Sequence, residues 1–254
     1  MSWASRRRLL YTTGILLFLG LVFGIPAAIW WHEPPSCFDG KLNQEETATD
    51  KGGPCILIDE RALTPYSVLW SRAFPVRDGA YNVAAYIENP NSDASVRSVR
   101  YIFKLYDDKN VVVAERIGRT FIMPGGITPV FEGSIDTGNR AVLRTFFEFI
   151  EAPIWERLSD VSSVIVISNK TVTTPGISPR ITARVENTSV APILEPGFVA
   201  VVFDTAGNAF AASQTTLPRL DPGETREIVF TWFAPFEKAV GRIDILPVVP
   251  PVER

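Results

Sequence analysis

The sequence predicts an all-β protein, in which two tandem antiparallel β-sandwiches follow one N-terminal transmembrane helix. Three observations carry this prediction: an uncharged apolar stretch near the N-terminus, strands in which apolar and polar residues alternate, and a weak repeat of domain size. The 20 prolines and 17 glycines among 254 residues indicate many turns, which favours strands over helices. The chain is long enough for two domains that each bury a core.

The predicted membrane anchor runs from Leu9 to Trp31, about 23 residues without a charge, which is long enough to cross a bilayer as a helix. Three arginines, Arg6 to Arg8, precede it, so the positive-inside rule places residues 1–8 in the cytoplasm. We therefore expect a single-pass protein of the cell membrane whose bulk, after Trp31, is extracytoplasmic.

Two further hypotheses concern this segment. A cleaved signal peptide is the disfavoured alternative, because its apolar region is usually shorter and Pro26-Ala27-Ala28 is a poor cleavage site. Gly20 and Gly24 match the small-xxx-small pattern that lets two membrane helices approach closely, which suggests a homodimer through this face. The alternative is that the glycines only accommodate Pro26 nearby.

Residues 32–60 are expected to form a stalk module closed by a disulfide. Cys37 and Cys55 are the only cysteines and both lie in the exported part, where a disulfide is the default and a free thiol the alternative. The spacing from Cys37 to Cys55 resembles the short extracellular module written CxDGxxNxxETxxDCGGxC. It departs at Lys51, where that module has a third cysteine.

Four side chains of this module place oxygen ligands at short intervals beside glycines: Asp39, Asn43, Glu46 and Asp50. A calcium loop requires such a pattern, so a structural Ca²⁺ held by these four residues is one hypothesis. The other is a metal-free disulfide knot with solvated polar side chains, which Lys51 favours because it lowers the local negative charge. No other cofactor is expected.

The rest of the chain repeats weakly at an offset of about 98 residues, which is a domain-sized period. The landmarks are Glu88-Asn89 and Glu186-Asn187, Tyr106-Asp107 and Phe203-Asp204, and Pro124-Gly125 and Pro222-Gly223. We therefore expect a first sandwich over residues 61–168, a linker over 169–178 and a second sandwich over 179–254.

The strand before the first turn shows the clearest alternation, with Val99, Tyr101, Phe103 and Leu105 on one face. Its end, Phe103 to Asp107, has the sequence FKLYD, which resembles the FxLYD family and related immunoglobulin-like modules of bacterial envelope proteins. The second copy is similar but lacks the motif. The resemblance implies two immunoglobulin-like sandwiches and no specific ligand. From the residues themselves, Phe103 and Leu105 fill a core and Asp107 accepts backbone hydrogen bonds that start a turn.

Between Ser134 and Ile154 we expect the first copy to have about sixteen residues that the second lacks, in an extra hairpin or helix. Its aromatic residues Phe146, Phe147 and Phe149 are expected to lie in the core. If they are partly exposed, they are the best candidate for a contact surface.

No catalytic site is expected, because the one histidine, His32, lies at the membrane interface and the two cysteines pair with each other. The net charge of −3 and the lack of a Lys/Arg cluster after Arg8 exclude a nucleic acid as an expected partner. The main hypothesis is a membrane-anchored structural or binding protein of the cell envelope that presents its sandwiches to a protein or glycan partner. The alternative is a carboxylate-dependent envelope glycan hydrolase, which requires two carboxylates about 5–10 Å apart in a groove.

Overall fold

The computed structural model describes residues 3–27, 35–173 and 177–253. Its contacts divide the chain into two compact units, Met1–Cys55 and Ile56–Arg254. The C-terminal end of the predicted span at Trp31, the histidine His32 and part of the predicted linker, residues 174–176, lie outside the described residues.

The N-terminal unit begins with one apolar helix. It comprises α1 (Trp3–Leu19), a short π-helical turn η1 (Gly20–Gly24) and continuing helix up to Ala27. By length and composition this helix can cross a membrane, a test that an N-terminal signal sequence also passes. No heavy atom lies within 4 Å of where a Cβ would stand on Gly20 or Gly24, so this face of the helix is uncovered within the described chain.

Residues 37–55 of the same unit form the disulfide module, in which Cys37 and Cys55 are bonded with their Cα atoms 5.4 Å apart. The backbone turns tightly here: Gln44, Glu45 and Asp50 have positive φ angles, as do Gly52 and Gly53. The expected intramolecular disulfide is therefore present in the structure.

The first sandwich of the larger unit contains two antiparallel sheets. One has the order β1-β2-β5; the other has the order β4-β3-β6, and β7 also pairs with β3. The strands are β1 (Ser67–Arg77), β2 (Ala80–Asn89), β3 (Ser95–Tyr106), β4 (Val112–Ile122), β5 (Gly126–Asp136), β6 (Arg144–Phe149) and β7 (Trp155–Glu156), preceded by a 3-10 turn η2 (Glu60–Ala62). The alternating residues of β3 point into the core between the sheets, where Phe103 and Leu105 are fully buried.

The second sandwich repeats this arrangement with sheets of order β14-β9-β8 and β12-β11-β15. A 3-10 turn η3 (Ser162–Val164) precedes β8 (Ile165–Thr173), β9 (Arg180–Asn187), β10 (Ile193–Leu194), β11 (Gly197–Asp204), β12 (Ala209–Thr216), β13 (Arg219–Leu220), β14 (Thr225–Thr231) and β15 (Val240–Val248). The short strands β10 and β13 pair with each other. The predicted all-β fold class with two sandwiches is confirmed.

The segment that seemed to be an insertion in the first copy is a regular strand of its sheet. β6 pairs with β3 in the first sandwich just as β15 pairs with β11 in the second. The expectation of an extra hairpin or helix between Ser134 and Ile154 is therefore wrong. Both copies contain the same six main strands. The apparent insertion came from aligning Ala152-Pro153 with Ala234-Pro235. The first pair follows β6, whereas the second precedes β15, the strand equivalent to β6.

The chain passes between sandwiches earlier than expected. Residues 169–173 of the predicted linker lie in β8, which pairs with β9 of the second sandwich. Their sequence explains this, because the run from Ile165 to Val172 is rich in β-branched residues that favour a strand. At the other end, the body begins before residue 61, since Ile58 is 7% exposed and joins the core of the first sandwich.

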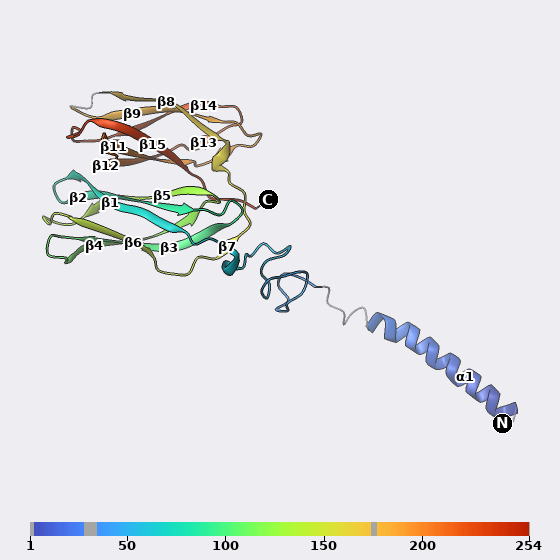
Figure 1. The fold of residues 1–254 in the computed structure, drawn as a ribbon. Coiled ribbons are helices and arrows are strands. Elements are labelled where there is room, and N and C mark those ends of the chain that lie inside the picture. Colours follow the sequence, from blue (N-terminus) through green and yellow to red (C-terminus); the bar gives the residue numbers. More distant parts are fainter. Residues whose placement is uncertain (1–2, 28–34, 174–176, 254) are drawn as a thin grey trace. The chain divides into compact units, whose positions relative to one another are not determined.

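The two sandwiches pack on each other through a third apolar core, so that the four sheets form one stack (Figure 1). This core lies between the outer face of β1-β2-β5 and the outer face of β12-β11-β15. Its buried members are Phe74, Ala84, Tyr86, Val199, Val201, Phe203, Ala209 and Ala212. Because both faces of β2 and β11 are covered, every residue from Val83 to Ile87 and from Phe198 to Phe203 is buried.

Polar contacts reinforce the junction. Arg72 and Asn82 of the first sandwich donate hydrogen bonds to backbone carbonyls of the edge strand β12, at Ala209 (3.0 Å) and Ala212 (3.1 Å). At the C-terminus, Val252 pairs with Ser159 between the sandwiches. The two sandwiches are thus joined by a shared core, by two side-chain hydrogen bonds and by the bridge between Ser159 and Val252.

Candidate functional site

The FxLYD residues of the first sandwich serve the fold. Phe103 and Leu105 are in the core, and Tyr106 lies half-buried on the opposite face, where the Arg144 guanidinium is 5.1 Å from its ring centroid. Asp107 accepts hydrogen bonds from the backbone N–H groups of Lys109 (3.0 Å) and Val111 (2.8 Å). These contacts start the turn between β3 and β4, as expected for this carboxylate.

The second copy uses Asp204 in the same way. Its carboxylate accepts hydrogen bonds from the N–H groups of Ala206 (3.0 Å) and Asn208 (2.8 Å). A cation also pairs with each turn carboxylate, Arg140 with Asp107 and Lys238 with Asp204. The pKa of each carboxyl group is lowered, chiefly by the backbone N–H of Val111 for Asp107 and of Asn208 for Asp204.

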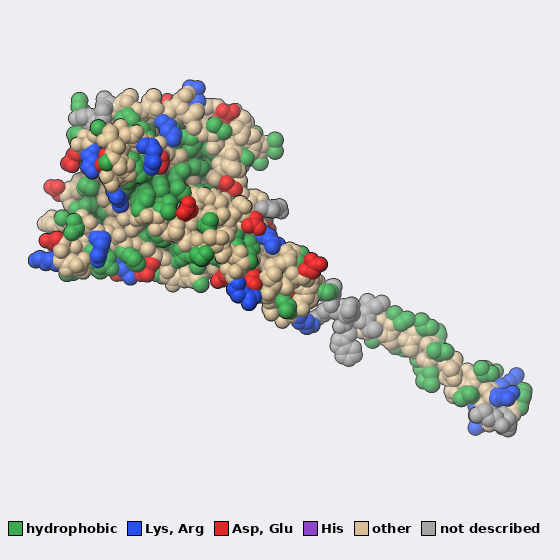
Figure 2. All heavy atoms as spheres, in the orientation of Figure 1, with side chains coloured by type: hydrophobic (Ala, Val, Ile, Leu, Met, Phe, Trp, Pro, Cys, Tyr) green, Lys and Arg blue, Asp and Glu red, His purple; other side chains and the backbone are tan. Residues whose placement is uncertain are grey.

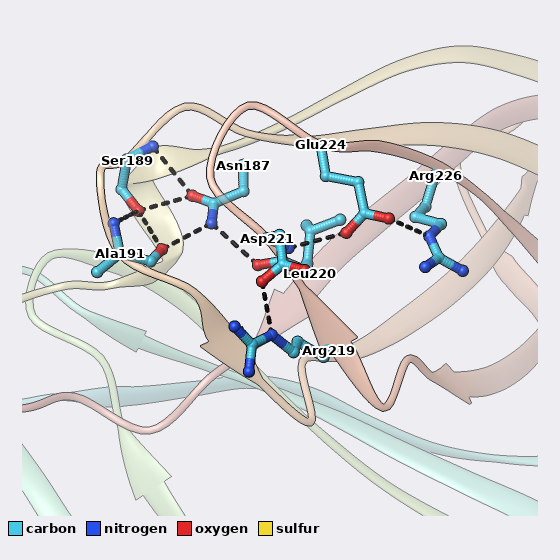
Figure 3. A network of polar contacts seen from close by, with 8 residues as sticks. All are labelled: Asn187, Ser189, Ala191, Arg219, Leu220, Asp221, Glu224 and Arg226. Carbon is cyan, nitrogen blue, oxygen red and sulfur yellow. Dashed lines mark hydrogen bonds and ion pairs between the residues drawn. The ribbon is translucent and has the colours of Figure 1, made fainter.

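The second landmark of the repeat is a buried asparagine that ties loops together (Figure 3). Asn187 is fully buried; its amide group donates to the carbonyls of Ala191 (2.8 Å) and Leu220 (3.1 Å), and its Oδ1 accepts from Ser189. Asn89, also fully buried, donates to the carbonyls of two loops in the first sandwich. The repeat thus marks positions that determine the fold rather than a shared ligand site.

The four predicted calcium ligands are near one another, but their oxygens mostly bind the backbone of the module. Asp39 accepts from the Lys41 N–H (2.8 Å) and the Asn43 side-chain amide (2.8 Å), and the latter contact is the main cause of its lowered pKa. Glu46 accepts from the N–H groups of Asn43 and Asp50, and Asp50 accepts from that of Gly40. These bonds hold the turns of the module in place.

A cation fits this arrangement poorly. Among the described residues, the ligand atoms of Asp39, Glu46 and Asp50 do not gather within 4.8 Å of one another, whereas those of Cys37, Glu46 and Cys55 do. The two sulfur atoms of that second group form a disulfide and are not thiolate ligands. The buried Oδ1 of Asn43 lacks a hydrogen-bond partner.

The three phenylalanines of β6 do not form one exposed surface. Phe147 is 4% exposed and packs against Phe103 in the core, with ring centroids 4.9 Å apart. Phe149 is half-buried against Tyr66, and only Phe146, 46% exposed, faces solvent. The alternation of a strand separates them, so the core interpretation describes two of the three better.

A groove of about 870 Å³ lies at the junction of the two sandwiches. Three loops form its rim: the β1–β2 turn at Arg77 to Gly79, the β5–β6 loop at Asn139 to Ala141 and the β14–β15 loop at Thr231 to Lys238. Edge strand β12 forms one side with Phe210, Ala211, Ser213 and Gln214. Volumes of 300–1,000 Å³ are typical of small-molecule sites. In Figure 2, hydrophobic side chains gather between the two sandwiches with charged side chains around them.

One wall of this groove, here called the aromatic wall, consists of Phe210, Trp232, Phe233 and Phe236. The rings of Phe210 and Trp232 both pack on Phe236, with centroids 5.3 and 5.2 Å away. These three residues extend the core of the second sandwich, which holds them in place. Phe233 is 88% exposed beside them. An exposed phenylalanine next to a fixed aromatic cluster is typical of a contact surface.

The loops of the groove are fixed by their own backbone. Gly79 has φ +71° and lies so close to the β5–β6 loop that a Cβ there would be 1.9 Å from the Gly138 carbonyl oxygen. Ser134 has φ +56° in a bulge of β5, where its N–H donates to the Asn82 side chain (3.0 Å). Such bulges redirect neighbouring side chains and often lie beside binding sites.

The charges of the groove nearly cancel. Arg140 and Lys238 are paired with the turn carboxylates of the two repeats, and the remaining charged lining residues are Arg77, Asp78 and Glu237. The other polar groups are amides and hydroxyls, among them Asn139, Gln214 and Ser213. This composition suits an uncharged ligand that accepts and donates hydrogen bonds.

Comparisons with known proteins identify no family. No family model matches the chain, and no curated protein matches it. Among solved structures, red sea bream transglutaminase is similar over 76% of this chain and 32% of its own, at 10% identity and TM-score 0.24. A β-glucuronidase from Bacteroides uniformis is similar over 69% of this chain and 22% of its own, at 14% identity and TM-score 0.20.

A tandem CBM22 domain from Paenibacillus barcinonensis Xyn10C is similar over 76% of this chain and 92% of its own, at 8% identity and TM-score 0.15. This chain thus spans about a third or less of the length of the first two proteins. At these TM-scores the similarities carry no argument about activity or ligand.

Proposed function

We propose that this chain is a membrane-anchored, extracytoplasmic binding protein of the cell envelope, and that the groove between its sandwiches holds an uncharged, extended segment of a protein or glycan partner. The observation that supports this most directly is the aromatic wall, with Phe233 88% exposed beside three packed rings. The apolar helix supplies the anchor, and the arginines in its first turns, Arg6 to Arg8, favour a cytoplasmic N-terminus.

The aromatic wall offers a preorganised contact. Because Trp232 and Phe236 already pack on the core of the second sandwich, a ligand would not have to order them on binding. Covering the Phe233 side chain would contribute about 1.5–3 kcal/mol. The amides and hydroxyls around it would then fix the orientation of the ligand.

The rigid junction between the sandwiches supports the same proposal. The groove is lined by both sandwiches, so its shape depends on their packing, and that packing rests on a buried apolar core and two side-chain to backbone hydrogen bonds. A groove with fixed walls binds with a smaller entropic cost than one formed by mobile domains.

The hydrolase alternative receives less support. The acidic residues of the groove, Asp78 and Glu237, are both exposed to solvent. A general acid of a glycosidase needs a carboxyl group whose proton is retained by an apolar environment, as burial against apolar side chains provides. We therefore propose that the groove binds and does not cleave its ligand.

The proposal can be tested by photo-crosslinking in intact membranes. The full chain would carry a photoreactive phenylalanine at position 233, and a matched chain would carry it at position 190, where Val190 is 97% exposed on a loop that does not line the groove. We expect a defined peptide or glycan adduct from position 233 that position 190 does not give. Equal labelling at both positions would contradict the proposal, and glycan turnover abolished by Glu237→Gln would favour the hydrolase.

A further inference from the structure

The disulfide module has an unusual distribution of apolar and acidic side chains. Phe38 and Leu42 are 77% and 65% exposed, whereas the carboxylates of Asp39, Glu46 and Asp50 are half-buried and accept backbone N–H hydrogen bonds. A small module in water is expected to expose its carboxylates and cover its phenylalanine and leucine. The surface of this module therefore suits an environment that is partly apolar.

The position of the module in the chain indicates which environment this is. Five residues, 32–36, separate the end of the apolar stretch from Cys37, and a fully extended chain of that length spans at most about 20 Å. The headgroup layer that borders the hydrocarbon core extends over roughly 5–8 Å on each side of the bilayer. The module is thus confined to the vicinity of the membrane surface.

We propose that Phe38 and Leu42 insert into the membrane interface, so that the disulfide module forms a second, peripheral contact of the chain with the lipid bilayer. This inference rests on the membrane anchoring of the proposed function. Lys41 is exposed between the two apolar residues, and a lysine at that place can extend its ammonium group to the headgroups while its methylene chain stays with the apolar side chains.

Because the module is tethered to the membrane helix, Phe38 and Leu42 are sufficient to keep it inserted in the membrane interface. Free in solution, a module with one phenylalanine and one leucine would partition weakly into a bilayer. Attached to a transmembrane helix by a short connection, it meets the interface at a high effective concentration, so that a small gain from each side chain keeps it inserted. Three of the four carboxylates, those of Asp39, Glu46 and Asp50, do not oppose this contact, because the structure turns them toward the backbone of the module. The fourth, Glu45, is exposed.

The lipid surface that suits the module carries no net charge. The segment from Cys37 to Cys55 contains four acidic residues, Asp39, Glu45, Glu46 and Asp50, and two lysines, Lys41 and Lys51. An anionic bilayer would repel this net negative charge, whereas zwitterionic headgroups would not. The chemistry therefore favours phosphatidylcholine or phosphatidylethanolamine headgroups over anionic lipids.

The test uses the full chain in phosphatidylcholine vesicles, with a photoreactive phenylalanine placed at one of four positions. Position 21 lies in the apolar helix, positions 38 and 42 are the proposed contacts, and position 49 replaces Thr49, an exposed polar residue of the same module. After irradiation, mass spectrometry measures lipid adducts on each peptide, and non-reducing mass spectrometry checks that the disulfide is intact in each variant.

We expect lipid adducts at positions 38 and 42 to exceed those at position 49 by at least about tenfold, because burial of either side chain contributes more than 1.4 kcal/mol. If position 21 reacts with lipid while 38 and 42 react no more than 49, the peripheral contact is refuted and the anchor stands. If position 21 also fails to react, both this inference and the proposed anchoring are refuted. Adducts at position 38 to protein in place of lipid would equally overturn the inference.

Discussion

Substitution of the buried asparagine of the second sandwich should be among the most destabilising changes in the chain. Asn187→Ala removes the amide that donates to the Ala191 and Leu220 carbonyls and the oxygen that accepts from Ser189. Leu220 is fully buried, so water cannot replace the bond to its carbonyl, whereas Ala191 is exposed and can be solvated again. The Asn187 Oδ1 accepts from both the N–H and the hydroxyl of Ser189, so one fully lost bond and three partly compensated ones amount to roughly 2–4 kcal/mol.

The Asp variant at the same position provides a sharper test of this mechanism. Asn187→Asp keeps the acceptor for Ser189 but turns the two donated bonds into repulsion between a carboxylate and two carbonyls. In this buried position the pKa of the new carboxyl group should be raised above its unfolded value. The folded form then binds a proton that the unfolded form releases, so stability should recover as the pH falls through the raised pKa.

The assay is urea unfolding of the full chain in detergent, followed by far-ultraviolet circular dichroism at pH 7 and pH 5. Asn139→Ala is a suitable control, because Asn139 is exposed and no hydrogen bond of its side chain occurs among the described residues. We expect both Asn187 variants to lower the urea midpoint strongly at pH 7, and only the Asp variant to recover at pH 5. A loss of less than about 0.5 kcal/mol, the range of ordinary surface substitutions, would refute the reasoning.

Three further outcomes follow from the structure. Ala84→Asp should separate the unfolding of the two sandwiches into two calorimetric transitions, because Ala84 faces the core between them. Ala85→Asp, on the opposite face of the same strand, should unfold the first sandwich itself. One shared transition for both variants would contradict this expectation. The lowered pKa of Asp107 should make its share of stability disappear as the pH falls below about 3.8, and Asp107→Asn should weaken this acid dependence in urea titrations at pH 6 and pH 3. Calorimetry of the full chain should give no heat at millimolar calcium, since its carboxylates already bind backbone N–H groups, and a heat that Asp39→Ala abolishes would establish the calcium loop instead.

The alternation of β3 was enough to predict its buried face, because the period of a strand is fixed by its backbone. The repeat landmarks were equally informative, since a buried asparagine and a turn aspartate are held at fixed places by hydrogen bonds that a sandwich of this type requires. The same offset also relates Arg140 to Lys238, the cations of the two turn ion pairs, and it was the available signal for that contact.

The sequence also contains a signal that the two sandwiches stack, although stacking was not predicted. The runs from Val83 to Ile87 and from Phe198 to Phe203 are apolar without alternation, which is typical of strands covered on both faces. The groove could not be predicted in this way. Its lining comes from loops and strands far apart in the chain, and only the packing of two non-equivalent sheets brings them together.

The comparison of the two copies separates residues that maintain the fold from residues available for binding. Positions that recur, such as Asn89 with Asn187 and Asp107 with Asp204, are occupied by hydrogen bonds within each sandwich. The aromatic wall does not recur, because the β5–β6 loop at Asn139 to Ala141, which is equivalent to the β14–β15 loop, contains no aromatic residue. Phe210, Trp232 and Phe236 pack on the core of the second sandwich, so folding accounts for them. Phe233 is left in solvent, and the ligand that we propose for this end of the stack would cover it.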